Sequence, residues 1–182
     1  MGFSVQLSDF ELMRRVADGD QQAFSTLLDR HSKMVLNLSY RIVLSRDDAE
    51  DLCQEVFERL WTQAPTWRDD AKLTTWLHRV TSNLALNYSQ RVQQRHVLDD
   101  GLVEFIVDSA VSDEPVNEDE NTAVLDALKA LPDSQRAVMA FRFYQDTSVK
   151  DIAKIMGLSA KAVESLIGRA KQQLKARLGG RE

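Results

Sequence analysis

Residues 149–168 read VKDIAKIMGLSAKAVESLIG, and this stretch decides how the C-terminal part of the chain folds. A helix-turn-helix needs a small residue where its helices cross, a glycine able to adopt positive φ in the turn, and a branched apolar residue facing inward from the second helix. Ala153, Gly157 and Val163 meet these needs at the expected offsets. Ser159 is a good N-cap for the second helix. The stretch therefore predicts a DNA-binding helix-turn-helix, whose alternative is a helical hairpin that packs only against other helices.

The second helix of this motif carries polar side chains on the side that faces away from the core. The inward positions are Val163, Ile167, Ala170 and Leu174. The candidates for DNA contact are Lys161, Glu164, Ser165, Arg169 and Lys171. Ser and Lys can reach base edges or phosphates, and a glutamate can accept a hydrogen bond from a cytosine amino group. A basic tail that includes Lys171 suits the phosphate backbone.

The charge of the chain is distributed unevenly along its 182 residues. Its hydrophobic share of 43% and charged share of 28% are those of a globular protein, and its net charge is −5. Residues 1–95 carry a net charge of −1, residues 96–120 carry −9, and residues 121–182 carry +5. This distribution predicts a near-neutral domain, an acidic connector and a basic C-terminal domain.

Helical periodicity runs through almost every segment outside the connector, and no run alternates as a strand would. The predicted helices cover about residues 8–17, 21–44, 45–63, 73–95, 120–131, 133–144, 148–156 and 159–178. We expect an all-α fold of two small helical domains, residues 1–95 and 120–182, joined by a flexible acidic linker over 96–119. That linker could span at most about 80 Å.

The sequence of the long fourth helix predicts two different faces, one buried and one polar. Leu73, Leu77, Val80, Leu84 and Tyr88 form its buried face. A neighbouring polar stripe consists of Trp76, Arg79, Asn83, Asn87, Gln90, Arg91 and Gln94. Basic, amide and aromatic side chains without acids suit single-stranded nucleic acid, because they stack on bases and neutralise phosphates. Composition alone favours a solvated face; the helix-turn-helix downstream shifts the interpretation toward DNA.

Catalytic and membrane signals are absent from the sequence. His31, His78 and His96 have no neighbouring Cys, His or Asp cluster at metal-ligand spacing, and no GxxxxGK phosphate loop occurs. Cys53, the single cysteine, excludes an internal disulfide and is expected to be a buried structural thiol. We therefore expect no enzyme, cofactor or metal site. The start of the chain is not a secretory signal and nothing is expected to insert into a membrane, so we expect a cytoplasmic protein.

Four blocks of the chain, taken in order, resemble the extracytoplasmic-function (group IV) sigma factors of bacterial RNA polymerase. They read DGDQQAFSTLLDRH from residue 18, DDAEDLCQEVFERLW from residue 47, TTWLHRVTSNLALNY from residue 74, and ALKALPDSQRAVMAFRFYQDTSVKDIAKIMGLSAKAVESLIGRAKQQLKARL from residue 127. The resemblance implies a region 2 domain and a region 4 domain, with no region 1.1 or region 3. It also implies that the acidic linker runs toward the RNA exit channel.

The resemblance assigns expected roles to individual residues. The residues that would dock on the β′ clamp of core RNA polymerase are Asp51, Gln54, Glu55 and Glu58, whose alternative is a merely solvated helix face. The loop Trp67 to Lys72, with Asn83 behind it, would capture a flipped base of the promoter −10 element, and Trp76 would lie at the melting edge. Arg79, Asn87 and Arg91 would extend this −10 surface.

The helix-turn-helix would read the −35 element, and its domain would bind the β flap. The resemblance also implies an anti-sigma factor as a partner. Many relatives carry Arg at the position of Glu164 and a bulkier residue at that of Gly168, so the −35 sequence cannot be taken from a relative. The predicted function is that of an alternative sigma factor. The alternatives are a self-sufficient helix-turn-helix regulator that binds as a dimer, and a helical adaptor that never binds DNA.

Overall fold

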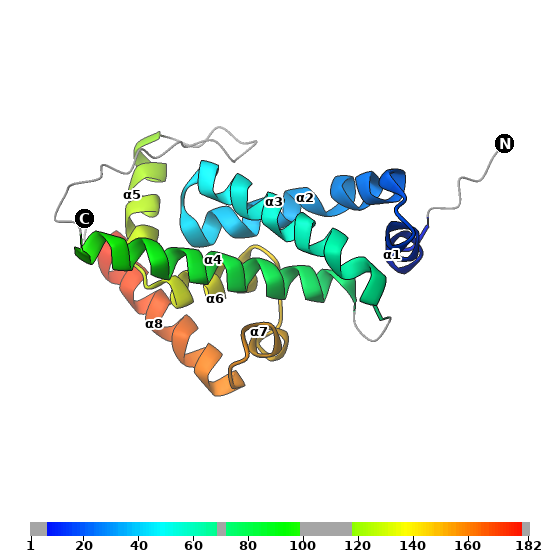
Figure 1. The fold of residues 1–182 in the computed structure, drawn as a ribbon. Coiled ribbons are helices and arrows are strands. Elements are labelled where there is room, and N and C mark those ends of the chain that lie inside the picture. The colour runs from blue at the N-terminus through cyan, green and yellow to red at the C-terminus, as the bar shows by residue number, and fades with distance from the viewer. Residues whose placement is uncertain (1–6, 69–71, 99–117, 180–182) are drawn as a thin grey trace.

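The computed structural model describes residues 7–68, 72–98 and 118–179, and within these ranges the chain forms helices without a strand. The elements are α1 (Asp9–Ala17), α2 (Gln21–Val43), α3 (Arg46–Gln63), the short 3-10 helix η1 (Ala64–Thr66), α4 (Leu73–Leu98), α5 (Glu118–Lys129), α6 (Asp133–Phe143), α7 (Val149–Met156) and α8 (Ala160–Leu178). The predicted all-α fold class is confirmed (Figure 1). No described helix has the length and apolar character needed to cross a bilayer.

Helices α1–α4 form an N-terminal unit whose boundaries follow local chemistry. The Ser45 hydroxyl accepts from the backbone N–H of Asp48, as a serine N-cap at the start of α3 should. Proline cannot donate the backbone hydrogen bond that a longer helix needs, and Pro65 lies in η1, just after α3 ends. The fully buried side chains of this unit include Met13, Leu27, Val35, Leu38, Ile42, Val56, Leu60 and Leu77.

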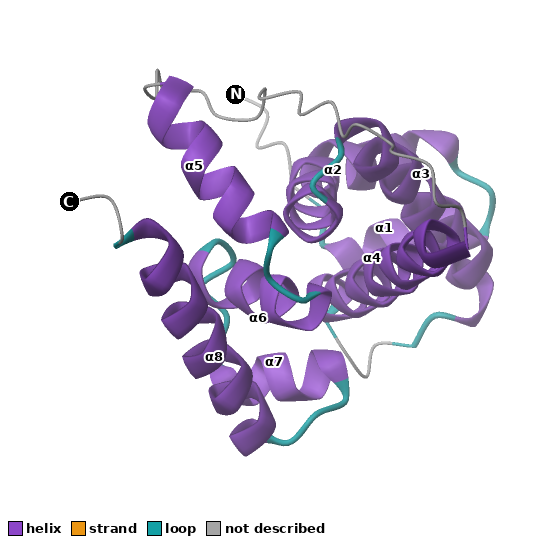
Figure 2. Cartoon of the chain, turned by 90° about the vertical axis from the view of Figure 1, so that its left-hand side faces the viewer, coloured by secondary structure: helices purple, strands orange, loops and turns teal. Residues whose placement is uncertain are grey.

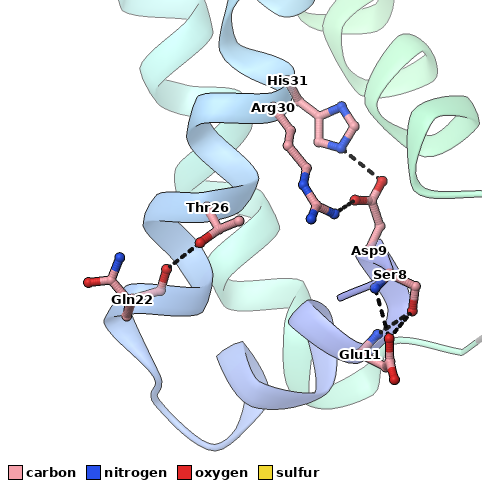
Figure 3. A network of polar contacts seen from close by, with 7 residues as sticks. All are labelled: Ser8, Asp9, Glu11, Gln22, Thr26, Arg30 and His31. Carbon is pink, nitrogen blue, oxygen red and sulfur yellow. Dashed lines mark hydrogen bonds and ion pairs between the residues drawn. The ribbon is translucent and has the colours of Figure 1, made fainter. Parts of the chain in front are cut away.

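Helix α1 is fixed to α2 by a network of polar contacts (Figure 3). Ser8 and Glu11 form a capping box, and the hydrogen bonds from Ser8 lower the pKa of the Glu11 carboxylate. The Asp9 carboxylate accepts from Arg30 at 2.9 Å and lies 2.8 Å from Nε2 of His31, both on α2. Because these groups are only part-buried, the network positions α1 more than it stabilises the core.

Helices α5–α8 form a C-terminal unit that contains the predicted helix-turn-helix. Gly157 ends α7 in the left-handed region, with φ of 66°. Ser148 caps α7 and Ser159 caps α8, each by accepting from the backbone N–H three residues later. Val163 is fully buried and Ala153 nearly so. These features confirm the helix-turn-helix geometry predicted for this stretch.

The two units pack against each other, which periodicity alone did not predict. Figure 2 shows α5–α8 on one side of the bundle made by α2, α3 and α4. Arg136 of α6 is buried and donates to the carbonyl oxygen of Ile42 at the end of α2, at 2.9 Å. It also donates to the carbonyl of Leu131 and pairs with the carboxylate of Asp133. Burial raises the pKa of the Asp133 carboxyl, although the guanidinium opposes this rise.

Aromatic contacts complete the interface between the units. The rings of His78 on α4 and Phe141 on α6 meet edge to face, with centroids 5.6 Å apart. The guanidinium carbon of Arg41 on α2 lies 3.1 Å from the centre of the Tyr144 ring. Buried apolar residues of both units therefore belong to one continuous core.

Two details differ from the sequence-based predictions. Helix α4 continues to Leu98 and α5 starts at Glu118, so both ends of the predicted linker are helical, while residues 99–117 lie outside the described residues. The buried surface of α4 is also wider than one apolar stripe. It takes in the polar side chains of Thr81, Ser82 and Ser89.

Candidate partner and nucleic-acid interfaces

The outer side of α3 carries the residues predicted to bind a protein partner. Asp51, Gln54 and Glu58 are exposed, on the side of α3 opposite its buried apolar residues. The Gln54 amide donates to Glu58 at 2.9 Å, which holds these two side chains parallel. Glu55 is half-buried and forms an ion pair with Arg59 at 2.6 Å. Arg59 therefore offsets part of the negative charge of this face.

A cavity of about 680 Å³ lies beside this face, between α2 and α3. Its apolar lining comes from Phe24, Leu28, Leu36, Phe57 and Trp61, whereas Glu50, Gln54, Glu58 and Thr62 supply polar atoms. The sequence-based predictions did not include this cavity. The exposed Trp61, edge-on to Phe24 with centroids 5.1 Å apart, was the available signal. Such a cavity suits an amphipathic helix with apolar and basic side chains.

Cys53 lines this cavity and is not the fully buried thiol that its position on the helix predicted. It is half-buried, and its sulfur lies 3.9 Å from the carbonyl oxygen of Ser32. Partial burial raises the pKa of the thiol, and Glu50 adds to this rise. The apolar stripe of α3 continues into the cavity wall, so a stripe position did not guarantee full burial here.

Two tryptophans join the predicted base-capture loop to α4. The rings of Trp67 and Trp76 meet edge to face, with centroids 5.9 Å apart, and both are half-buried. Arg68 and Lys72, at either end of the undescribed residues 69–71, are exposed. The aromatic pair fixes where the loop leaves the bundle, while the cations beside it face solvent.

The polar stripe of α4 is exposed along the described part of the helix. Arg79, Asn83, Asn87 and Arg91 are all exposed and follow each other at intervals of four residues. They cover about 18 Å of helix length. Gln90 is exposed beside them, whereas the side chain of Gln94 lies outside the described residues. The packing of α6 and α7 on α4 therefore leaves these stripe residues accessible.

The outer side of α8 carries the predicted −35 contacts. Lys161, Glu164, Ser165 and Arg169 are exposed, opposite the buried Val163 and Ala170. The guanidinium of Arg169 donates to the hydroxyl of Ser165 at 2.9 Å. This contact couples two candidate DNA-reading side chains within one helix.

Lys171 is also exposed and lies two turns after Glu164 on the same side of α8. Its ammonium lies 5.2 Å from the centre of the Phe143 ring at the end of α6. This aromatic contact holds the ammonium toward α6, where a phosphate contact is geometrically simpler than a base contact.

In the described part of the chain, no group of three or more His, Cys, Asp or Glu side chains is placed to hold a metal ion.

Comparison with known proteins identifies both units. The family model described as Sigma-70 region 2 matches residues 27–96, and that described as Sigma-70, region 4 matches residues 121–174. The "ECF RNA polymerase sigma-E factor" of Haemophilus influenzae is 30% identical over 183 residues, which cover 95% of this chain and 96% of the relative.

Two solved structures share the fold. The sigma factor RpoE of Bartonella quintana, solved with the anti-sigma factor NepR, superposes with a TM-score of 0.68 and 21% identity, covering 87% of this chain and 98% of that one. CnrH, solved with the cytosolic domain of CnrY, gives a TM-score of 0.69 and 25% identity, covering 96% of this chain and 99% of that one. The likeness to RpoE supports the fold alone.

Proposed function

Because this chain belongs to the extracytoplasmic-function sigma factors of the sigma-70 family, we propose that three of its surfaces divide the work of such a factor. The protein is an alternative sigma factor, which binds core RNA polymerase and directs promoter recognition and transcription initiation. In our proposal α3 docks on the polymerase, α4 with its preceding loop opens the −10 element, and α8 reads the −35 element.

The polar stripe on α4 is the observation that carries this proposal. A stripe of two arginines and two asparagines, accessible while the opposite side is buried, suits an unpaired strand. Arginines neutralise phosphates, and asparagine amides pair with exposed base edges. Trp76 stops the duplex at the melting edge, and the loop from Trp67 to Lys72 takes up the flipped base with Asn83 behind it. Flipping costs a few kcal/mol, which these contacts offset.

The helix-turn-helix supplies the second promoter contact. Lys161, Glu164 and Ser165 face base edges in the major groove, and Arg169 and Lys171 bind phosphates. Because phosphate contacts carry no sequence information, the specificity of this contact comes from the first group.

The acidic face of α3 and the cavity next to it form the polymerase-docking surface. Asp51, Gln54, Glu55 and Glu58 contact the β′ clamp, while the C-terminal unit contacts the β flap. An anti-sigma factor is a further partner in this proposal, as membership of the extracytoplasmic-function sigma factors implies. Such a factor would compete for the same surface, because an amphipathic helix fits the cavity.

The chain divides for this work into residues 1–95 for core binding and the −10 element, an acidic linker over 96–119, and residues 120–182 for the −35 element. It acts in the cytoplasm and without catalysis of its own. Two promoter contacts made by one chain reinforce each other, because the second forms at a high effective concentration.

Footprinting on a duplex promoter, with and without core RNA polymerase, tests the proposal. We expect protection of the −10 and −35 elements only when core is present. Protection without core would favour a self-sufficient regulator, and no protection in either condition would favour an adaptor.

The docking surface is tested separately by Asp51→Arg, with Asp18→Arg at the end of α1 as the matched charge reversal. Both aspartates are exposed, so neither change should lower thermal stability measurably. We expect roughly a tenfold loss of core affinity for Asp51→Arg alone, measured by competition against wild-type protein. Equal core affinity in both variants would remove α3 from the docking surface.

A further inference from the structure

Gly168 stands at a position of α8 where nothing inside the protein requires a glycine. It lies within the helix, and a Cβ built on it would meet no atom within 4 Å. Glycine inside a helix is less stable than alanine, because it loses more backbone freedom on folding. Internal packing and backbone conformation therefore both permit a larger residue there.

Gly168 lies at the centre of the outward face of α8. At 100° per residue, it points about 140–160° away from Val163 and Ala170, the buried residues of this helix. Glu164 and Ser165 lie one turn before it on the same face and are exposed. The hydrogen bond from Arg169 to Ser165 runs along one side of the glycine. The result is a patch of bare helix backbone bordered by polar side chains.

We propose that Gly168 is a specificity-determining position, at which the α8 backbone itself contacts promoter DNA. This inference rests on the proposed role of α8 as the −35 reader. The backbone N–H and C=O groups in the middle of a helix are already paired within it, so the patch offers no donor or acceptor. What fits against it is an apolar group of DNA, either the C5 methyl of thymine or a carbon of deoxyribose.

A close approach of the α8 backbone to DNA at Gly168 also determines whether neighbouring side chains can contact the bases. Ser165 has a short side chain, so its hydroxyl contacts a base edge only when the helix lies deep in the groove. A methyl group at position 168 would hold the helix away from the DNA by roughly the length of a carbon–carbon bond, about 1.5 Å. Hydrogen bonds weaken steeply over such a displacement.

Gly168→Ala tests the proposal in the full chain reconstituted with core polymerase. We expect the thermal midpoint of the free protein to rise by a few degrees, because alanine is the better helix former. We expect promoter affinity to fall by roughly tenfold, and the ranking of −35 variants to change. The matched control is Gln173→Ala, exposed on α8 but about 140° away, which should leave both affinity and ranking unchanged.

Uracil in place of thymine at each −35 position identifies the group that Gly168 contacts. If wild-type affinity falls at one position and that of Gly168→Ala does not, the contact is a thymine methyl. If uracil has no effect while Gly168→Ala still binds weakly, the contact is deoxyribose. A variant that is more stable but ranks and binds all −35 sequences as wild type does would overturn the proposal. If the promoter affinity of the wild-type holoenzyme does not change with the −35 sequence, the proposed role of α8 as the −35 reader is refuted instead.

Discussion

The N-terminal unit and the C-terminal unit bury their central helices in different ways. In the N-terminal unit, the long helices α2, α3 and α4, of 23, 18 and 26 residues, pack on each other, and each has exposed residues. In the C-terminal unit, α6 has only 11 residues and is buried over more than one face, with two charged side chains included. The side of α6 left open by α7 and α8 is covered by α2 and α4.

This difference shows that the smaller unit depends on the larger one. Units of about 60 residues bury a modest fraction of their unfolded surface, so an additional packing surface matters more to the C-terminal unit. In the proposed function, the two units contact two promoter elements at once. If those elements lie farther apart than the packed units reach, this interface must open, and stability of the free protein and activity in the holoenzyme then place opposite demands on α6.

The strongest test of this dependence is Arg136→Ala. Removing the guanidinium takes the ion pair away from the buried Asp133 carboxylate and removes the donor to the carbonyls of Ile42 and Leu131. We expect a loss of about 3–5 kcal/mol in the free energy of unfolding, measured by urea denaturation. The control is Arg142→Ala on the same helix, whose ion pair with Asp146 is exposed and should contribute less than about 1 kcal/mol. Equal losses in the two variants would show that the interface does not hold α6.

Alanine substitutions at two glycines, one in each unit, test whether the two units unfold together. Gly19 lies between α1 and α2 and Gly157 between α7 and α8; both have positive φ, and a Cβ on either would meet no atom within 4 Å. Alanine at each position should cost about 1–2 kcal/mol through backbone strain alone. We expect both variants to shift one common calorimetric transition. Two transitions, each moved by only one of the variants, would contradict a shared core.

The smallest expected effect is a pH dependence that originates at the interface. Burial lowers the pKa of His78, the positive potential of His31 adds to this, and a hydrogen bond with Gln145 opposes it. The unfolded chain, with a histidine pKa of about 6.5, therefore takes up this proton before the folded one does. We expect unfolding free energy to fall from about pH 8 to about pH 5.5, and to fall less in His78→Gln. Parallel pH curves for the two proteins would exclude His78 as the cause.

The sequence predicted what depends on neighbours along the chain. The N-cap at Ser159, the left-handed Gly157 and the inward Val163 follow from local chemistry, and the structure has all of them. The exposure of the α3 face and the α4 stripe follows from helical spacing against an apolar stripe. These features need no knowledge of distant segments.

Features that depend on distant segments were missed. Thr81, Ser82 and Ser89 look like a solvent-facing edge of α4, and burial of this polar edge depends on how α4 packs in the folded protein. Arg136 is a charged residue, which is almost never fully buried without a partner, and its acceptors include Ile42, 94 residues away. The cavity beside α3 depends on the separation between α2 and α3, and no pattern of residues in the sequence encodes that separation.

The chain has a single cysteine, and that cysteine lines the α2–α3 cavity. Chemical labelling of Cys53 in the wild-type protein can therefore report whether the cavity is filled. The rate at which an alkylating reagent labels Cys53 depends on access and on the thiolate fraction, which the raised pKa of this thiol keeps small. Any protein seated in the cavity slows that labelling, whereas DNA bound at α4 or α8 leaves it unchanged. Mass spectrometry of labelled protein can thus follow, in a mixture, how much of the factor is engaged through α3.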